Sequence, residues 1–82
     1  MTTIEIISPL PGVFYRRPSP DSDVLASEGD QVESTTVIGI IEVMKQFSDL
    51  TADNKGTLIR FCVEDSEPVE PGQVIALVSI EE

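Results

Sequence analysis

The sequence predicts an all-β domain, built as a flattened antiparallel β-barrel or sandwich. Six prolines leave little room for long helices. The apolar residues gather in short runs rich in valine and isoleucine, which is typical of strands. Turn-forming residues separate these runs at short intervals, and strands of about five residues between close turns indicate a barrel or a sandwich.

Five runs are expected to be strands, and in chain order they are residues 4–7, 13–15, 37–44, 58–63 and 74–80. The third and fifth runs are almost continuously apolar, as buried strands are. The only helical candidate, residues 21–28, has a weak pattern. Ser48 and Asp49 have the composition of a turn.

Side-chain alternation predicts the two faces of the fourth run. Ile59, Phe61 and Val63 should share one face, and the opposite face is expected to carry Leu58, Arg60 and Cys62. Turns are expected at residues 11–12, 28–30, 53–56, 64–68 and 71–72, where glycine, proline, asparagine or aspartate recur.

The two halves of the chain resemble each other. A shift of 37 positions aligns residues 37–41 with 74–78, and a shift of 44 aligns 11–14 with 55–58. The first half therefore carries about seven extra residues, most simply placed in a thumb-like insertion at residues 16–23. This repeat predicts two similar units that pack face to face about a pseudo-two-fold axis, with the termini at one end and Lys45, in the connection between the units, at the other. The alternative is that short valine- and isoleucine-rich strands resemble one another by chance.

Composition excludes several functions. A net charge of −10, from 15 acidic and 5 basic residues, argues against binding nucleic acid or an anionic membrane. The acidic surface is either simply solvated or complementary to basic enzyme partners. The chain shows no secretory signal and no apolar run long enough to span a membrane, so a cytoplasmic location is expected.

The chain is also a poor candidate for an enzyme. It contains no histidine, and its single cysteine, Cys62, offers neither an internal disulfide nor a zinc site. No glycine-rich phosphate loop and no Ser-His-Asp set can be assembled. We therefore expect no catalytic residue and no bound metal, in one domain that is small enough to need a compact core.

One lysine stands out by its position. Lys45 is one of only two lysines, and it follows a strand-like apolar run in the middle of the chain. A lysine between two strands suggests a side chain that is modified. The alternative is an ordinary solvated lysine in a turn, which is how we interpret Lys55.

Several segments resemble the biotinyl domain of biotin carboxyl carrier proteins, most closely the carrier of bacterial acetyl-CoA carboxylase. The resemblance runs from Ser8 to Ile80 and rests on residues 8–16, 18–21, 41–45, 52–57 and 73–80. Glu42-Val43-Met44-Lys45 is similar to the acceptor motif, which is usually Glu-Ala-Met-Lys with the last residue biotinylated. Pro18-Ser19-Pro20-Asp21 looks like the start of the thumb that marks this subgroup.

The resemblance implies a fold and a function for residues 1–82. It implies a biotinyl/lipoyl-type barrel-sandwich hybrid of two four-stranded sheets that carries biotin covalently on Lys45 and takes no catalytic part itself. Glu42, Val43 and Met44 would complete the attachment site, and the thumb would contact biotin. The equal alternative is that the thumb is an ordinary surface loop without a contact to biotin. The implied partners are a biotin protein ligase, a biotin carboxylase that fixes CO2 from bicarbonate with ATP, and a carboxyltransferase, with acetyl-CoA as acceptor.

Three positions depart from the family pattern, and two rival interpretations are also open. Val43 replaces the usual alanine, Gln46 replaces methionine or leucine, and Ser34-Thr35-Thr36 stands where a Gly-Asp turn is common. A lipoyl-type carrier domain shares the fold, but its lysine usually lies in an Asp-Lys-Ala context without a thumb. The second rival is an unmodified β-sandwich that binds proteins through an acidic face. The chain is expected to be either a short stand-alone carrier or a fragment.

Overall fold

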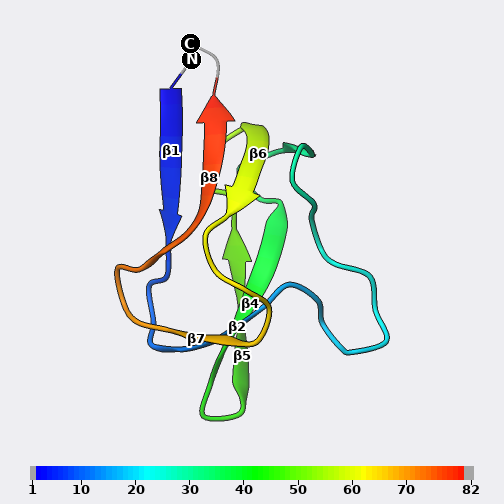
Figure 1. Cartoon of the computed structure of the whole chain (residues 1–82), viewed down its shortest axis with the longest axis vertical. Helices are drawn as coiled ribbons and strands as arrows, with labels where there is room; N and C mark the ends of the chain where they lie inside the picture. The colour runs from blue at the N-terminus through cyan, green and yellow to red at the C-terminus, as the bar shows by residue number, and fades with distance from the viewer. Residues whose placement is uncertain (1, 81–82) are drawn as a thin grey trace.

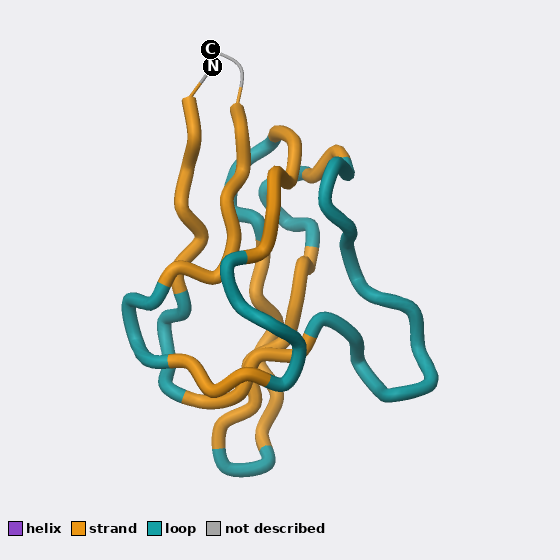
Figure 2. The backbone as a smooth tube through the Cα atoms, in the orientation of Figure 1, coloured by secondary structure: helices purple, strands orange, loops and turns teal. Residues whose placement is uncertain are grey.

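Two four-stranded antiparallel sheets face each other in the computed structural model, which describes residues 2–80 (Figures 1 and 2). No helix occurs among these residues, which confirms the predicted all-β class. In chain order the strands are β1 (Thr2–Ile7), β2 (Gly12–Tyr15), β3 (Gln31–Val32), β4 (Val37–Val43), β5 (Gln46–Thr51), β6 (Gly56–Phe61), β7 (Glu67–Val69) and β8 (Val74–Ile80).

The order of the strands confirms the predicted pseudo-two-fold symmetry. One sheet has the order β1-β8-β6-β3 and the other has β5-β4-β2-β7, so each strand of the first half has an equivalent in the second. The register is equivalent too: Val43 pairs with Gln46, as Ile80 pairs with Thr2. The axis therefore exchanges the β4–β5 turn with the end of the domain where β1 begins and β8 ends (Figure 1).

The symmetry extends to individual hydrogen bonds. In the turn of residues 27–30, the amide of Ser27 donates to Asp30 Oδ2 at 2.9 Å. In the equivalent turn of residues 64–67, the amide of Glu64 donates to Glu67 Oε1, also at 2.9 Å. Gly29 and Ser66 occupy equivalent positions in these turns, with φ of 94° and 68°. The two halves thus share local backbone geometry as well as topology.

The core lies between the inner faces of the sheets. Its fully buried side chains come from equivalent positions of both halves and include Phe14, Ile38, Ile41, Leu58, Ile75 and Val78. Burying an aliphatic or aromatic side chain of this size stabilises the fold by about 1.5–3 kcal/mol. Both sheets depend on this shared core, which holds the β4–β5 hairpin in a fixed place.

The predicted helix at residues 21–28 is wrong, because this segment is an irregular loop. Its backbone groups bond outside the segment rather than along a helix. The amide of Leu25 donates to the carbonyl oxygen of Arg16 at 2.8 Å, and the carbonyl of Ser22 accepts from Arg17 Nη1 at 3.3 Å. Contacts with the two arginines therefore replace the i to i+4 bonds of a helix.

Two strand predictions also need correction. Ile59 does not share a buried face with Val63, because a bulge in the pairing of β6 with β8 leaves Ile59 40% exposed. Ser48 and Asp49 do not form a turn but lie inside β5, which the sequence analysis did not predict. The short strands β3 and β7 were missed as well. Each has at most three residues, too few to show a period.

Candidate functional site

The β4–β5 hairpin ends in a two-residue turn. Val43 and Gln46 form its last pair, and Met44 and Lys45 lie between them. Both turn residues have positive φ, 51° for Met44 and 66° for Lys45. Positive φ at both central residues defines a type I′ turn, whose twist matches that of the flanking strands. Met44, which the sequence analysis placed at the end of a strand, is therefore a turn residue.

The backbone conformation of this turn is energetically unfavourable for methionine and lysine. Type I′ turns favour asparagine and glycine, whereas a left-handed conformation costs other residues roughly 1–2 kcal/mol each. Met44 is also 91% exposed, more than any other large hydrophobic residue described. Backbone strain and exposed apolar surface occur together at sites that serve function rather than stability.

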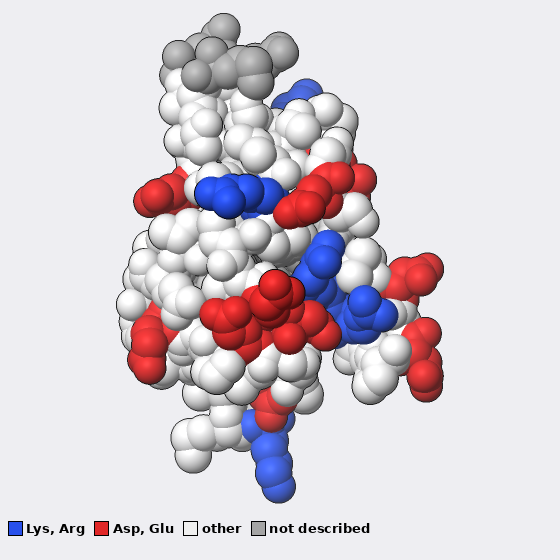
Figure 3. All heavy atoms as spheres, viewed as in Figure 1, with Lys and Arg blue, Asp and Glu red and all other residues white. Residues whose placement is uncertain are grey.

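Lys45 is exposed at this turn. In the view of Figure 3, a basic side chain projects beyond the end of the molecule where Figure 1 places the β4–β5 turn. Because the Lys45 side chain is exposed, another molecule can reach its terminal amine. Lys55, by contrast, is an exposed residue of the β5–β6 connection, near the other end of the sheets.

Glu42 and Val43 are less exposed than the turn. Val43 is half-buried and packs against the core, which anchors the hairpin. Glu42 accepts a hydrogen bond from the phenol of Tyr15 on the neighbouring strand β2. This bond raises the pKa of Tyr15 above its usual value of 10.0, and desolvation and the charges of Glu42 and Asp65 raise it further. No sequence motif singled out Tyr15 as a site residue.

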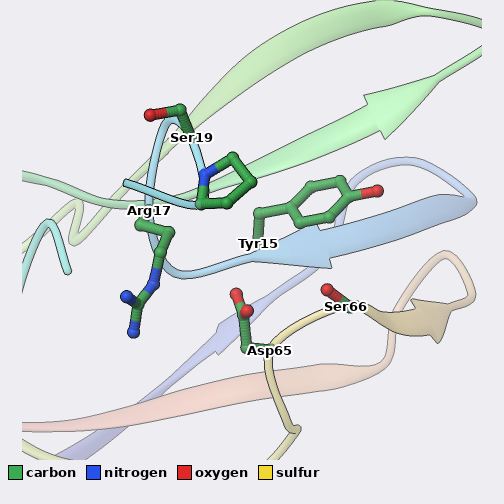
Figure 4. Close-up of a pocket in the computed structure, with 6 residues that line it drawn as sticks. Tyr15, Arg17, Ser19, Asp65 and Ser66 are labelled. Carbon is green, nitrogen blue, oxygen red and sulfur yellow. The ribbon is translucent and has the colours of Figure 1, made fainter. Parts of the chain in front are cut away.

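Two hollows lie near the hairpin. A shallow groove of about 410 Å³ is lined by Leu10, Val43, Met44, Gln46 and Ser48, so it borders the Met44–Lys45 turn directly. A smaller hollow of about 210 Å³ is lined by Tyr15, Arg17, Ser19, Pro20, Asp65 and Ser66. In Figure 4, Ser19 lies on one side of the smaller hollow and Asp65 and Ser66 on the other, with Tyr15 between them. Tyr15 thus lines this hollow and also bonds to Glu42.

The smaller hollow lies beneath the loop that connects β2 to β3, residues 16–30. Figure 2 shows the outermost part of this loop standing away from the two sheets. The bond from Leu25 to Arg16 closes its base. The bonds between Ser19 and Ser22 and between Arg17 and Ser22 lie within the closed part. These hydrogen bonds of residues 17–24 therefore stay within the loop, and we call this segment the projection.

Other kinds of site are not evident in the described part of the chain. Residues 2–80 contain no cluster of three or more histidine, cysteine, aspartate or glutamate side chains that could hold a metal ion. They also contain no helix with the length and hydropathy needed to cross a membrane. Cys62 is a free, exposed thiol.

Comparison with known proteins identifies relatives of the whole domain. Residues 4–78 match the biotin/lipoyl family model, described as "Biotin-requiring enzyme". The biotin carboxyl carrier protein of acetyl-CoA carboxylase from Nostoc sp. is 39% identical over 84% of this chain and 38% of its own length. The protein of the same name from Pyropia yezoensis is 36% identical over 89% of this chain and 46% of its own length. The chain thus spans less than half the length of these relatives.

The fold is also found in a solved structure. A segment of Kluyveromyces lactis urea carboxylase superposes with a TM-score of 0.80 and 24% identity, covering 96% of this chain and 6% of the other. That similarity supports the fold alone, while the family match spans nearly every described residue. The chain therefore belongs to the biotin/lipoyl domain family of biotin-requiring enzymes.

Proposed function

We propose that this chain is a biotin carboxyl carrier with biotin attached to Lys45. The observation that carries the proposal is an exposed lysine held at positive φ in a two-residue turn, in a member of this family. In the attachment reaction, the amine of Lys45 attacks the activated carboxyl carbon of biotin. A C–N amide bond forms, the bond to the activating group breaks, and one proton leaves the nitrogen.

The residues of the hairpin fit such a group. The turn directs the amine away from the core, and lysine's long stem together with biotin makes a mobile tether. Once bound, biotin supplies the nitrogen that takes up and releases the carboxyl group. The protein supplies position, because a tether holds the group at an effective concentration on the order of millimolar near a docked active site.

The partners are proposed from the relatives. The relatives are carriers of acetyl-CoA carboxylase. We therefore propose that this chain carries the carboxyl group from a biotin carboxylase to a carboxyltransferase that uses acetyl-CoA. It would itself be non-catalytic. A biotin protein ligase would recognise Glu42, Val43 and Met44 beside the acceptor lysine. The projection of residues 17–24 would be the thumb of this subgroup.

Mass spectrometry tests the proposal directly. The chain is co-expressed with a biotin protein ligase, and the intact mass is measured for wild type, Lys45→Arg and Lys55→Arg. We expect one biotin on wild type and on K55R and none on K45R. A lipoyl adduct on Lys45 would indicate the lipoyl-type alternative, and an unmodified wild type would indicate an interaction module.

A further inference from the structure

One row of side chains crosses the outer face of the sheet that contains the hairpin. Strand pairing places Phe47, Glu42, Val13 and Pro68 side by side on four neighbouring strands. All four point away from the core, because the residues that alternate with them, including Phe14, Ile41 and Val69, are buried. Phe47 is 65% exposed. We call these four residues the outer row.

The pseudo-symmetric row on the other sheet has a different chemistry. The equivalent positions are Thr3, Ser79, Thr57 and Gln31, and their pairings match those of the outer row. These residues are all polar, and Gln31 Nε2 donates a hydrogen bond to Thr57 Oγ1 at 3.0 Å. The fold therefore accommodates polar side chains at all four equivalent positions, so it does not itself require apolar side chains in the outer row.

The outer row lies beside the acceptor turn. Phe47 is two residues beyond Lys45, about 7 Å along the chain at the rise of a strand. Carboxylates flank the apolar side chains: Glu42 lies within the row, and Asp49 is exposed on the same face of β5. A partner that fits this surface offers an apolar pocket for the Phe47 ring and a rim of lysine and arginine.

We propose that the outer row is the docking surface for the biotin protein ligase, with the Phe47 ring as its main anchor. This inference rests on the proposed function of Lys45. The ligase must bring its active site onto the lysine nitrogen itself, so it must cover the turn and the residues beside it. A carboxylase or carboxyltransferase reaches biotin at the far end of the tether and can dock further away.

Exchanges with the symmetric row provide the test. Phe47→Thr copies Thr3 and Pro68→Gln copies Gln31, so each variant introduces a residue that the fold already accommodates. Phe47→Leu keeps an apolar anchor. Ile59→Thr is the matched control, because it removes an exposed apolar side chain from the other sheet. Thermal unfolding of each variant shows that it is folded, and initial rates of biotin incorporation give kcat and KM with purified ligase.

We expect F47T to raise the KM of the ligase about tenfold or more, since buried aromatic anchors dominate interfaces. P68Q should raise it by about threefold, while F47L and I59T stay within about twofold of wild type. Salt should raise the wild-type KM, because the flanking carboxylates take part. Biotinylated F47T should keep a wild-type KM with biotin carboxylase.

Specific outcomes would overturn the inference. Equal KM values for wild type, F47T and P68Q would show that the ligase does not use this surface, although Lys45 would still be the attachment site. A loss confined to the carboxylase assay would assign the surface to that enzyme instead. A wild type that takes up no biotin would refute the proposed function and this inference with it.

Discussion

The phenol of Tyr15 donates a hydrogen bond to the carboxylate of Glu42, three residues before Lys45. The bond joins β2 to β4 on the outer face of their sheet. It links the hollow beneath the loop, which Tyr15 lines, to the strand that leads into the Met44–Lys45 turn. This pair of side chains thus lies between the loop and the hairpin.

This pair makes the tyrosine hard to ionise. Loss of the phenol proton breaks the bond and places a second negative charge beside Glu42 and Asp65, so the pKa of Tyr15 lies above 10.0. Glu42→Gln should move the pKa back toward 10.0. The chain has one tyrosine and no tryptophan, so tyrosinate absorbance during an alkaline titration reports this group alone.

The raised pKa also sets a direction for stability. The folded state binds this proton more tightly than the unfolded state does, so the contribution is complete below pH 10 and is lost as the pH rises through the folded pKa. Glu5→Gln, on the other sheet, is the control and should leave the titration unchanged. A wild-type midpoint at or below 10.0 would contradict the hydrogen bond.

The strained backbone of the Met44–Lys45 turn should lower the stability of the domain, while Lys45 is needed for the proposed function. Replacing Met44-Lys45 with Asn-Gly keeps the type I′ geometry and removes two strained residues. We expect a gain of at least about 1 kcal/mol in the free energy of unfolding, a Tm rise of at least roughly 4 °C, and complete loss of biotin attachment. Urea unfolding and intact mass measure the two effects. Lys55→Gly, at a residue without positive φ, should give no gain. A less stable Asn-Gly variant would contradict the strain.

The sequence predicted the fold well because its repeat is genuine. The shift of 37 that aligns residues 37–41 with 74–78 also relates β4 to β8. Prediction failed where pairing between strands overrides local pattern. The bulge at Ile59 turns an alternating run to a different face, and β5 contains Ser48 and Asp49 because its edge position leaves these side chains in water.

The candidate site was predictable only in part. The motif at residues 42–45 drew attention to Lys45, but nothing local indicated that Met44 and Lys45 would both have positive φ, since neither is glycine or asparagine. Tyr15 and Phe47 escaped notice because their role depends on strand register. Only the pairing of Glu42 with Val13 and Phe47 shows which side chains surround the motif.

Gly12 is required for a close approach rather than for a turn. Its φ is not positive, and an added Cβ would lie far inside contact distance of the carbonyl oxygen of Glu42. Gly12→Ala should cost about 2 kcal/mol or more of unfolding free energy, because the backbone of β4 cannot move away. Gly56, which meets Ser79 in the same way, should behave alike.

Gly29→Ala is the informative comparison for Gly12→Ala in urea unfolding. Gly29 has open space around it but a φ of 94°, so its substitution should cost only about 1 kcal/mol. Equal losses at the two positions would show that backbone conformation rather than crowding determines the cost. A G12A variant with the unfolding free energy of wild type would mean that the backbones of β2 and β4 lie further apart at this position.

The projection of residues 17–24 should be removable without unfolding the domain. The Leu25 amide already bonds to the Arg16 carbonyl, so two glycines in place of these eight residues would form a β-turn closed by the same bond. The bonds of Arg17, Ser19 and Ser22 that would be lost lie within the projection. We expect the unfolding free energy to stay within about 1 kcal/mol of wild type, since loop length contributes weakly.

Attachment of biotin should also survive this deletion. The acceptor turn and the outer row lie on strands whose pairing does not involve residues 17–24, so the KM of the ligase should stay within about twofold of wild type. Unfolding in urea and initial rates of biotin incorporation measure the two quantities on one preparation. A cooperative loss of structure would show that the projection supports β2. A stable variant with a much higher KM would show that the ligase reaches past the outer row to the loop.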